Sequence, residues 1–383
     1  MKTFKLSLML IGCAFAATGC GGYEAPADAP NPPDASRVSA TPLKESSSPW
    51  ALNSSMETAR QLHTATVLDT GEVLVAGGNN SEQEFIADAE LYNPYSDSWY
   101  PTEPMNLGRW GHAATALGSG QVLVAGGLSP EGWTASAELY DPRTGTWSQT
   151  GPMNIPRLLP TMTRLDSGLV LVTGGVSSDW NVVASAELYD PWTGKWTRTG
   201  SMNVPRAQHT VTLMYTGEVM VTGGLNFTDS VLKSAELYNP RTGRWTRLGS
   251  MSVPRMAHTA TMLYSGKVLV TGGAEGYADD SAELYDPYNR KWSALPPMHV
   301  PRVSHLATQL YSGEVLVTGG VGYEDYEASA ELYDPVKNAW RPAGTMGEGR
   351  TFHTATRLHT GQILVTGGQN FSGQHAEVTR FSP

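Results

Sequence analysis

The chain has 383 residues, of which 41 are glycine and 25 are proline, and only 16% are charged. Short runs rich in β-branched residues, separated by turn residues, dominate it, and this composition indicates an all-β protein with few helices. The formal net charge of −10 excludes a broad nucleic-acid-binding surface, because phosphate contacts require an excess of lysine and arginine.

The first 19 residues have the features of an export signal. Lys2 and Lys5 precede the apolar run LSLMLIGCAFAA, and small residues lead from Ala17 to Cys20. This order is typical of a signal peptide rather than a membrane-spanning helix. The cysteine after the small residues resembles the lipobox of bacterial lipoproteins, although that family usually has Leu where Ala17 stands. The resemblance implies that Cys20 becomes the lipidated first residue of a cell-envelope protein; a plain signal peptide with an incidental cysteine is the alternative.

Residues 20–48 are predicted to form a flexible tether behind this anchor. They are rich in Pro, Ala, Ser and Asp and almost free of large apolar side chains, so they cannot bury enough surface to offset the entropy of ordering. Cys13 and Cys20 are the only cysteines. The mature domain is therefore expected to have no disulfide and no thiolate metal site.

Residues 49–383 contain one pattern repeated seven times. The first glycine of a Gly-Gly pair falls at positions 77, 126, 174, 223, 272, 319 and 367, in steps of 47 to 49 residues. A Trp followed six residues later by a Met recurs with the same period, and an arginine follows each Met by four residues. These arginines are Arg60, Arg109, Arg157, Arg206, Arg255, Arg302 and Arg350. A histidine follows each arginine by three residues, except in the third repeat, which has Pro160.

Each repeat contains four segments with the character of strands. The first resembles HTATxL, the second is the apolar run VLVxGG, the third is AELY, and the fourth begins with the Trp. A run such as VLV is typical of a strand that is covered on both faces. Four strands every 47 to 49 residues is the period of a β-propeller blade.

The Gly-Gly pair, a Tyr seven residues before a Trp (as in Tyr92 and Trp99) and the Met-x-x-x-Arg segment resemble kelch repeats. They are similar in particular to bacterial kelch proteins, whose repeats also resemble the propeller of galactose oxidase. The resemblance implies one kelch-type β-propeller over residues 49–383. It is specific for the fold and weak for the function, because one fold hosts many activities.

The two ends of the repeat region indicate how the ring closes. The last repeat stops after AEVTRFSP without a Trp segment, and an unpaired segment from Trp50 to Met56 precedes the first repeat. The N-terminal strand is therefore expected to complete the last blade, which gives seven blades of four strands and leaves no weak seam and fewer exposed edges.

The connection between the second and third strands is the only one that varies in length. From the second glycine to the Glu of AELY the distance is 12, 11, 12, 12, 10, 11 and 9 residues. These loops share a face with the Met-x-x-x-Arg connections, and loops on a rigid scaffold commonly bind ligands. Acidic residues gather in two of them, at Asp279 and Asp280 and at Glu324, Asp325 and Glu327. Their aromatic residues are Phe85, Trp133, Trp180, Phe227, Tyr277, Tyr323, Tyr326 and Phe371. The loops are predicted to recognise a sugar or peptide; the alternative is that each aromatic ring folds over its own blade.

The seven arginines have two interpretations. They could form an anion-binding ring at the mouth of the channel, or they could pair with a glutamate that begins the third strand of each repeat. These glutamates are Glu90, Glu138, Glu187, Glu236, Glu283, Glu331 and Glu377. The second interpretation, an ion-paired lattice that joins the blades, is favoured because buried charges need partners.

The remaining features give little support for catalysis. Six histidines, one per blade, are too dispersed for one metal site, and the acidic loops lack the spacing of a calcium loop. Relatives of galactose oxidase use copper with a cysteine-linked tyrosine, for which the mature chain has no cysteine. No catalytic residue, metal ligand or cofactor is therefore predicted. We expect a monomeric binding scaffold for a protein or carbohydrate ligand; a carbohydrate-active enzyme of the mutarotase or oxidase kind is the alternative.

Overall fold

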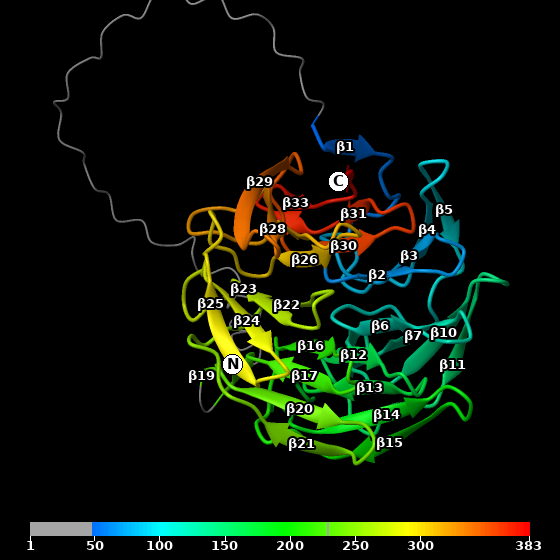
Figure 1. Ribbon diagram of the computed structural model, residues 1–383. Helices are drawn as coiled ribbons and strands as arrows, with labels where there is room; N and C mark the ends of the chain where they lie inside the picture. The colour runs from blue at the N-terminus through cyan, green and yellow to red at the C-terminus, as the bar shows by residue number, and fades with distance from the viewer. Residues whose placement is uncertain (1–47, 228–229) are drawn as a thin grey trace, which may run out of the picture.

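The computed structural model describes residues 48–227 and 230–383, so the expected signal peptide, Cys20 and most of the tether lie outside the described residues. The described chain forms seven four-stranded antiparallel sheets arranged in a ring (Figure 1). The prediction of a seven-bladed propeller is therefore confirmed. We number the sheets as blades 1 to 7 in chain order. No helix among the described residues is long and apolar enough to cross a membrane.

The strands occupy the same four positions in every blade. The innermost strands are β2 (Thr64–Val67), β6 (Ala113–Ala116), β12 (Thr161–Arg164), β16 (Thr210–Leu213), β22 (Thr259–Met262), β26 (Leu306–Gln309) and β30 (Thr354–Arg357). The second strands are β3 (Val73–Ala76), β7 (Val122–Ala125), β13 (Val170–Thr173), β17 (Val219–Thr222), β23 (Val268–Thr271), β27 (Val315–Thr318) and β31 (Ile363–Thr366).

The third strands are β4 (Ala89–Asn93), β10 (Ala137–Asp141), β14 (Ala186–Asp190), β20 (Ala235–Asn239), β24 (Ala282–Asp286), β28 (Ser329–Asp334) and β34 (Val378–Phe381). The outermost strands are β5 (Ser98–Thr102), β11 (Thr146–Thr150), β15 (Lys195–Thr199), β21 (Arg244–Arg247), β25 (Lys291–Leu295), β29 (Ala339–Thr345) and β1 (Trp50–Asn53). Three loops add short hairpins: β8 (Leu128–Ser129) with β9 (Gly132–Trp133), β18 (Leu225–Asn226) with β19 (Ser230–Val231), and β32 (Gln369–Asn370) with β33 (Gly373–Gln374).

The core of the protein lies between neighbouring blades. Each second strand, such as β3, is buried at all of its positions. Val73 and Val75 of blade 1 pack with Leu364 and Val378 of blade 7, and Met56 fills the same cluster. Because both faces of each blade contact another blade, the second strands are apolar throughout rather than alternating.

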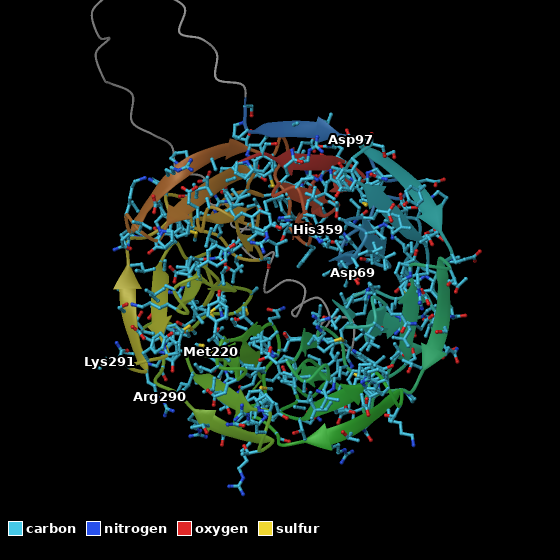
Figure 2. The ribbon with its side chains drawn as sticks, turned by 45° about the vertical axis from the view of Figure 1, so that its right-hand side comes forward. Asp69, Asp97, Met220, Arg290, Lys291 and His359 are labelled. Atoms are coloured by element: carbon cyan, nitrogen blue, oxygen red, sulfur yellow. The ribbon has the colours of Figure 1, made fainter. Side chains whose placement is uncertain are left out.

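The ring closes between the two ends of the described chain, as expected. β1 pairs antiparallel with β34, with Trp50 opposite Phe381 and Asn53 opposite Val378. Figure 2 shows β1 on the outer rim beside the C-terminal strands. Asn53 also donates a hydrogen bond of 2.6 Å to Asp97 of blade 1, so the N-terminal strand contacts both blades at the seam.

The outer rim is held by the repeated tryptophans. Each packs at a tilt on an aromatic ring of the third strand, as Trp99 does on Tyr92 with 5.0 Å between ring centroids. Six of their indole N–H groups donate to a backbone carbonyl of the previous blade or of the connection that leaves it, at 2.6 to 2.9 Å: those of Trp50, Trp99, Trp147, Trp245, Trp292 and Trp340. In six blades the repeated Trp therefore joins the outermost strand to the backbone that precedes it along the ring.

Candidate functional site

The variable loops and the Met-x-x-x-Arg connections lie on one face of the ring, which we call the loop face. Their proximity is seen in backbone hydrogen bonds: the amide of Arg109 donates to the carbonyl of Ile86 in the loop of blade 1, at 3.2 Å. The opposite face, which carries the turns between first and second strands, is called the turn face. Figure 2 shows two of these turn residues, Asp69 and His359, near the centre of the ring.

Six of the seven arginines form close, buried ion pairs with the predicted glutamate. In blade 4, Arg206 Nη2 lies 3.0 Å from Glu236 Oε1, and both side chains are fully buried. The other pairs are Arg60–Glu90, Arg109–Glu138, Arg157–Glu187, Arg255–Glu283 and Arg302–Glu331, with distances of 2.7 to 3.3 Å. Burial lowers the pKa of Arg206, and the hydrogen bond and charge of Glu236 oppose that effect. Removing one partner of such a pair typically costs about 3–5 kcal/mol.

These pairs do not join two blades, which corrects the predicted lattice. Arg60 and Glu90 both belong to blade 1, and Arg60 Nη1 also donates to the carbonyl of Gly77 in the same blade. Glu90 accepts hydrogen bonds from the backbone amides of Glu57 and Thr58, in the connection from blade 7. The pair therefore fastens each incoming connection to the blade that follows it. Because these six arginines are fully buried, they do not form an anion-binding ring at the mouth.

Blade 7 is the exception: Glu377 forms the predicted ion pair with Arg350, but it does not begin the third strand. The ladder pairs Val365 with Thr379, whereas the corresponding residue of blade 1, Val75, pairs with Glu90. Thr379 thus occupies the glutamate position. Glu377 lies two residues earlier, is exposed, and its Oε2 is 3.6 Å from Arg350 Nη2. This register buries Val378 and Phe381. Aligning Ala376-Glu377 with the Ala-Glu of the other repeats would require a different register.

The six repeated histidines connect neighbouring blades. Nε2 of His209 is hydrogen-bonded to Thr161 and Thr173 of the previous blade, at 2.9 and 3.0 Å. Comparable bonds are His63–Thr366, His112–Thr64, His258–Thr222, His305–Thr271 and His353–Thr318, at 2.8 to 3.4 Å. The prediction that these rings pack between blades is therefore confirmed. Burial lowers the pKa of His112, His209, His305 and His353 to about 3.

The interface between blades 2 and 3, which we call a seam like the other blade interfaces, lacks both the histidine ring and the threonine hydroxyls of this hydrogen bond. Pro160 stands where the other blades have the histidine, and blade 2 has Ala113 and Ala125 at the two threonine positions, of which every other blade keeps at least one. A buried hydroxyl without a partner would be costly, so the loss of the ring is matched by the loss of the hydroxyls. This match indicates that the histidine is a structural element of each seam.

A ring of residues with positive φ surrounds the channel at the loop face, and we call it the collar. Its members are Leu62, Gly111, Leu159, Gln208, Ala257, Ser304 and Phe352, with φ between 49° and 62°. Backbone bonds link successive members: the amide of Leu159 donates to Gly111 at 2.8 Å and that of Ser304 to Ala257 at 2.9 Å. Six collar residues line a cavity of about 240 Å³, together with three of the histidines and Pro160. The backbone is constant here while the side chain differs from blade to blade.

The predicted loop aromatics divide into two groups. Two pairs join the loops of neighbouring blades: Trp133 with Trp180, 4.6 Å between centroids, and Tyr326 with Phe371, 4.8 Å. The expectation that each ring folds over its own blade is therefore wrong for these pairs. Phe85 is half-buried. The exposed rings come from four consecutive blades, 4 to 7, and are Phe227, Tyr277, Tyr323 and Phe371.

The turn face carries exposed aromatic residues that the sequence analysis did not consider. Tyr215, Tyr264 and Tyr311 precede the Thr-Gly or Ser-Gly of three consecutive turns and are more than half exposed. Each lies beside the turn of the next blade, since a Cβ placed on Gly313 would be 3.5 Å from the ring of Tyr264. The signal was present in the repeated Tyr-Ser-Gly. The turns have constant length, so this face varies less than the loop face.

One group of side chains among the described residues has the composition and proximity of a metal site. Glu348, His375 and Glu377 each offer one donor atom, and these atoms lie within 4.8 Å of one another. All three belong to blade 7, where the repeat is broken. The repeat pattern gives no signal for this group, because His375 is not one of the repeated histidines.

Comparison with known sequences bears on the family. The kelch motif matches residues 109–154, 166–203, 205–252, 255–299 and 303–347, which together make up more than half of the chain. The chain belongs to the kelch-repeat family. No curated protein sequence matches the chain significantly.

Solved structures show the same kelch fold at low sequence identity. A fungal alcohol oxidase of the AA5 family, in complex with copper, is 19% identical with a TM-score of 0.73, over 87% of this chain and 76% of the oxidase. The structure of YjhT is 15% identical with a TM-score of 0.59, over 76% of this chain and 99% of that one. At these identities the likeness establishes the fold alone.

The residues of this kelch propeller do not fit a copper site with a cysteine-linked tyrosine. Both cysteines precede the described residues. The three repeated histidines that line the central cavity each have Nε2 hydrogen-bonded to a threonine hydroxyl. The one candidate ligand group in the described chain, around His375, is not part of the cavity lining. No reaction step is therefore derived through copper.

Proposed function

We propose that this kelch propeller is a binding scaffold that recognises a protein or carbohydrate ligand through its loop face. The observation that carries the proposal is the confinement of variation to that face. Loop lengths differ only there, and the collar changes its side chain in nearly every blade while its backbone stays constant. A rigid frame with variable residues on one face is the usual arrangement of a recognition surface.

The exposed rings of blades 4 to 7 supply the contact area for this role. Tyr277 is 73% exposed and Tyr323 is 58% exposed, and both lie next to acidic residues of their own loops. Aromatic rings give large apolar contacts at a low cost in side-chain entropy, and they are enriched among residues that dominate binding. The acids favour a ligand that carries hydroxyl or cationic groups.

Replacing both Tyr277 and Tyr323 by Ala is expected to abolish ligand binding without unfolding the protein. Both rings are exposed, so the melting temperature should stay within a few degrees of the parent. Binding is measured with the labelled full chain on a glycan array and a peptide array, and we expect the signal to fall at least about tenfold, which corresponds to one lost anchor residue.

The matched control is the pair Tyr264→Ala and Tyr311→Ala on the turn face, with exposed fractions of 53% and 57%. This variant should keep its array signal. If the turn-face variant loses binding and the loop-face variant keeps it, the recognition surface belongs to the turn face. A parent protein that binds no probe on either array would contradict the binding role itself.

We also propose that the propeller is held at a bacterial membrane through lipid on Cys20. The support is the order of charged, apolar and small residues before this cysteine, which lies outside the described residues. Wild-type protein should incorporate labelled palmitate and sediment with membranes, and Cys20→Ala should do neither. Exported wild-type protein that remains wholly soluble would contradict the anchor.

A further inference from the structure

Blade 7 differs from the other blades at three neighbouring positions. Glu348 stands where the others have Thr or an aliphatic residue, two positions after the repeated Met. His375 occupies a position that is aliphatic in blades 1, 3 and 4, as identified by its backbone bond to the second glycine of the blade. Glu377 stands where five blades have a serine. Single acids occur at these positions in other blades, with Asp279 and Glu327 at the position of His375 and Asp88 at that of Glu377. Blade 7 is the blade that combines a histidine with two carboxylates at one place.

The spacing of these side chains is close to that of a metal coordination sphere. Nδ1 of His375 lies 3.7 Å from Oε2 of Glu348, and the three donor atoms lie within 4.8 Å of one another. Two ligands of a tetrahedral zinc ion, each about 2.1 Å from the metal, are roughly 3.4 Å apart. Only small side-chain movements are therefore needed to bring all three onto one ion.

The imidazole of His375 is buried and makes no hydrogen bond to the described residues. The residue is 8% exposed, and Nε2 has no hydrogen-bond partner among the described residues. Nδ1 points toward the carboxylate of Glu348 from beyond hydrogen-bond distance. The six repeated histidines also have one ring nitrogen without a partner, but their other nitrogen is bonded to threonine. The ring of His375 makes no hydrogen bond to the described residues at either nitrogen, so both remain open to a ligand.

The surroundings support a cation. The two carboxylates face a single guanidinium, that of Arg350, which lies 3.6 Å from one oxygen of Glu377. The other oxygen remains for a metal. Asn370 donates a hydrogen bond of 3.3 Å to Oε2 of Glu348, and outer hydrogen bonds of this kind orient metal-binding carboxylates.

We propose that Glu348, His375 and Glu377 bind one divalent transition metal ion, with zinc as the best match. One imidazole and two carboxylates suit zinc better than calcium, which prefers oxygen ligands only. Three protein ligands leave a coordination position free. Glu348 also borders a cavity of about 260 Å³, which Tyr326 and Phe371 help to line, so that position is available to a water or ligand oxygen at the loop face. This inference does not depend on the proposed function.

Titration of the metal-free full-length chain with zinc tests the proposal by calorimetry, with the visible absorption of Co²⁺ as a second readout. We expect one ion per chain. Glu348→Gln and His375→Ala should each weaken binding about 100-fold or more, since even outer partners of a metal contribute 10- to 100-fold. Because Glu348 is exposed, its Gln variant should fold normally, which keeps the test valid if the buried histidine variant does not.

Glu131→Gln and His359→Ala are the matched controls, because both side chains are exposed and lie in other turns or loops. They should bind zinc as tightly as the parent. The proposal is overturned if the parent binds no zinc, if Glu348→Gln binds it unchanged, or if calcium displaces zinc at equal concentration. Loop-face tyrosine variants should retain zinc, so a failure of ligand recognition and a failure of this site are distinguishable.

Discussion

Deleting residues 1–57 is expected to unfold the propeller or cause it to aggregate. The deletion removes β1 and its buried Trp50, which packs on Phe381 and donates a 2.6 Å hydrogen bond to the carbonyl of Ala343. The deletion also removes Met56 from the core between blades 7 and 1. The loss of a buried Trp or Met alone costs about 2–5 kcal/mol. Both together should remove more than about 5 kcal/mol, which is a large part of the stability of a typical domain. The loss of stability is measured by thermal unfolding, with circular dichroism as the signal.

Deleting residues 1–45 is the matched control. Ser48 and Pro49, which hydrogen-bond to Trp50 and Ser382, remain in place. The free energy of unfolding should therefore change by less than about 0.5 kcal/mol, as for changes outside packed contacts. The longer deletion also exposes the backbone edge of β34, so aggregation should appear in that variant only. Equal melting temperatures for the two truncations would show that β1 does not close the ring.

The propeller could be predicted from the sequence because each blade repeats the same local pattern. The apolar second strand, the Gly-Gly pair and the Trp segment each reflect a contact that recurs in every blade. At Gly77, for example, φ is 67° and a Cβ would lie 2.7 Å from the carbonyl of Arg109 in the next blade. The repeated residues are therefore those that make the contacts between blades. Ring closure could be predicted because the last repeat lacks its fourth strand, which β1 supplies.

The position of Glu377 shows where alignment of the repeats by residue identity fails, because Glu377 does not begin the third strand of blade 7. The letters Ala-Glu at 376 and 377 match the other repeats, but the ladder is set by burying Val378 and Phe381, which moves the register by two residues. The loop length carried the signal: a distance of 9 residues to Glu377 is the shortest of the seven, and counting to Thr379 gives 11, as in blades 2 and 6.

The candidate sites were harder to predict because they consist of departures from the repeat. The pairing of Trp133 with Trp180 is a contact between two loops, which no spacing within a blade determines. The collar is invisible in the sequence, since its letters differ while its backbone is constant. His375 was passed over because it is not one of the repeated histidines, although its lack of repetition is what marks it.

Acidification below pH 6.5 is expected to destabilise the propeller steeply through the histidines of the seams. Burial lowers the pKa of His112, His209, His305 and His353 to about 3, and it lowers those of His63 and His258 well below the ordinary value. In the unfolded chain a histidine has a pKa of about 6.5. Between pH 6.5 and 3 the unfolded state therefore binds protons that the folded state does not, and the free energy of unfolding falls as the pH falls.

Each such histidine removes up to about 1.4 kcal/mol per pH unit once the pH is well below 6.5. Six together amount to roughly 8 kcal/mol per unit, so a protein of ordinary stability should unfold near pH 5. Urea midpoints measured from pH 8 to pH 5 test this expectation. Stability that stays flat between pH 7 and pH 5.5 would show that the rings take up protons within the folded propeller.

The seam between blades 2 and 3 provides a control for this prediction, because it has no histidine and no threonine hydroxyls at these positions. The triple variant Thr161→Ala, Thr173→Ala and His209→Pro copies Ala113, Ala125 and Pro160 into the next seam. It removes one titrating ring and both hydroxyls that the ring satisfies, so it leaves no buried hydroxyl without a partner. We expect it to fold at pH 8 and to lose up to about 1.4 kcal/mol per pH unit less than the parent on acidification. An unchanged pH slope would assign the acid sensitivity to groups other than the seam histidines, because His209 is buried between two blades and bonded to threonine, as the other five are.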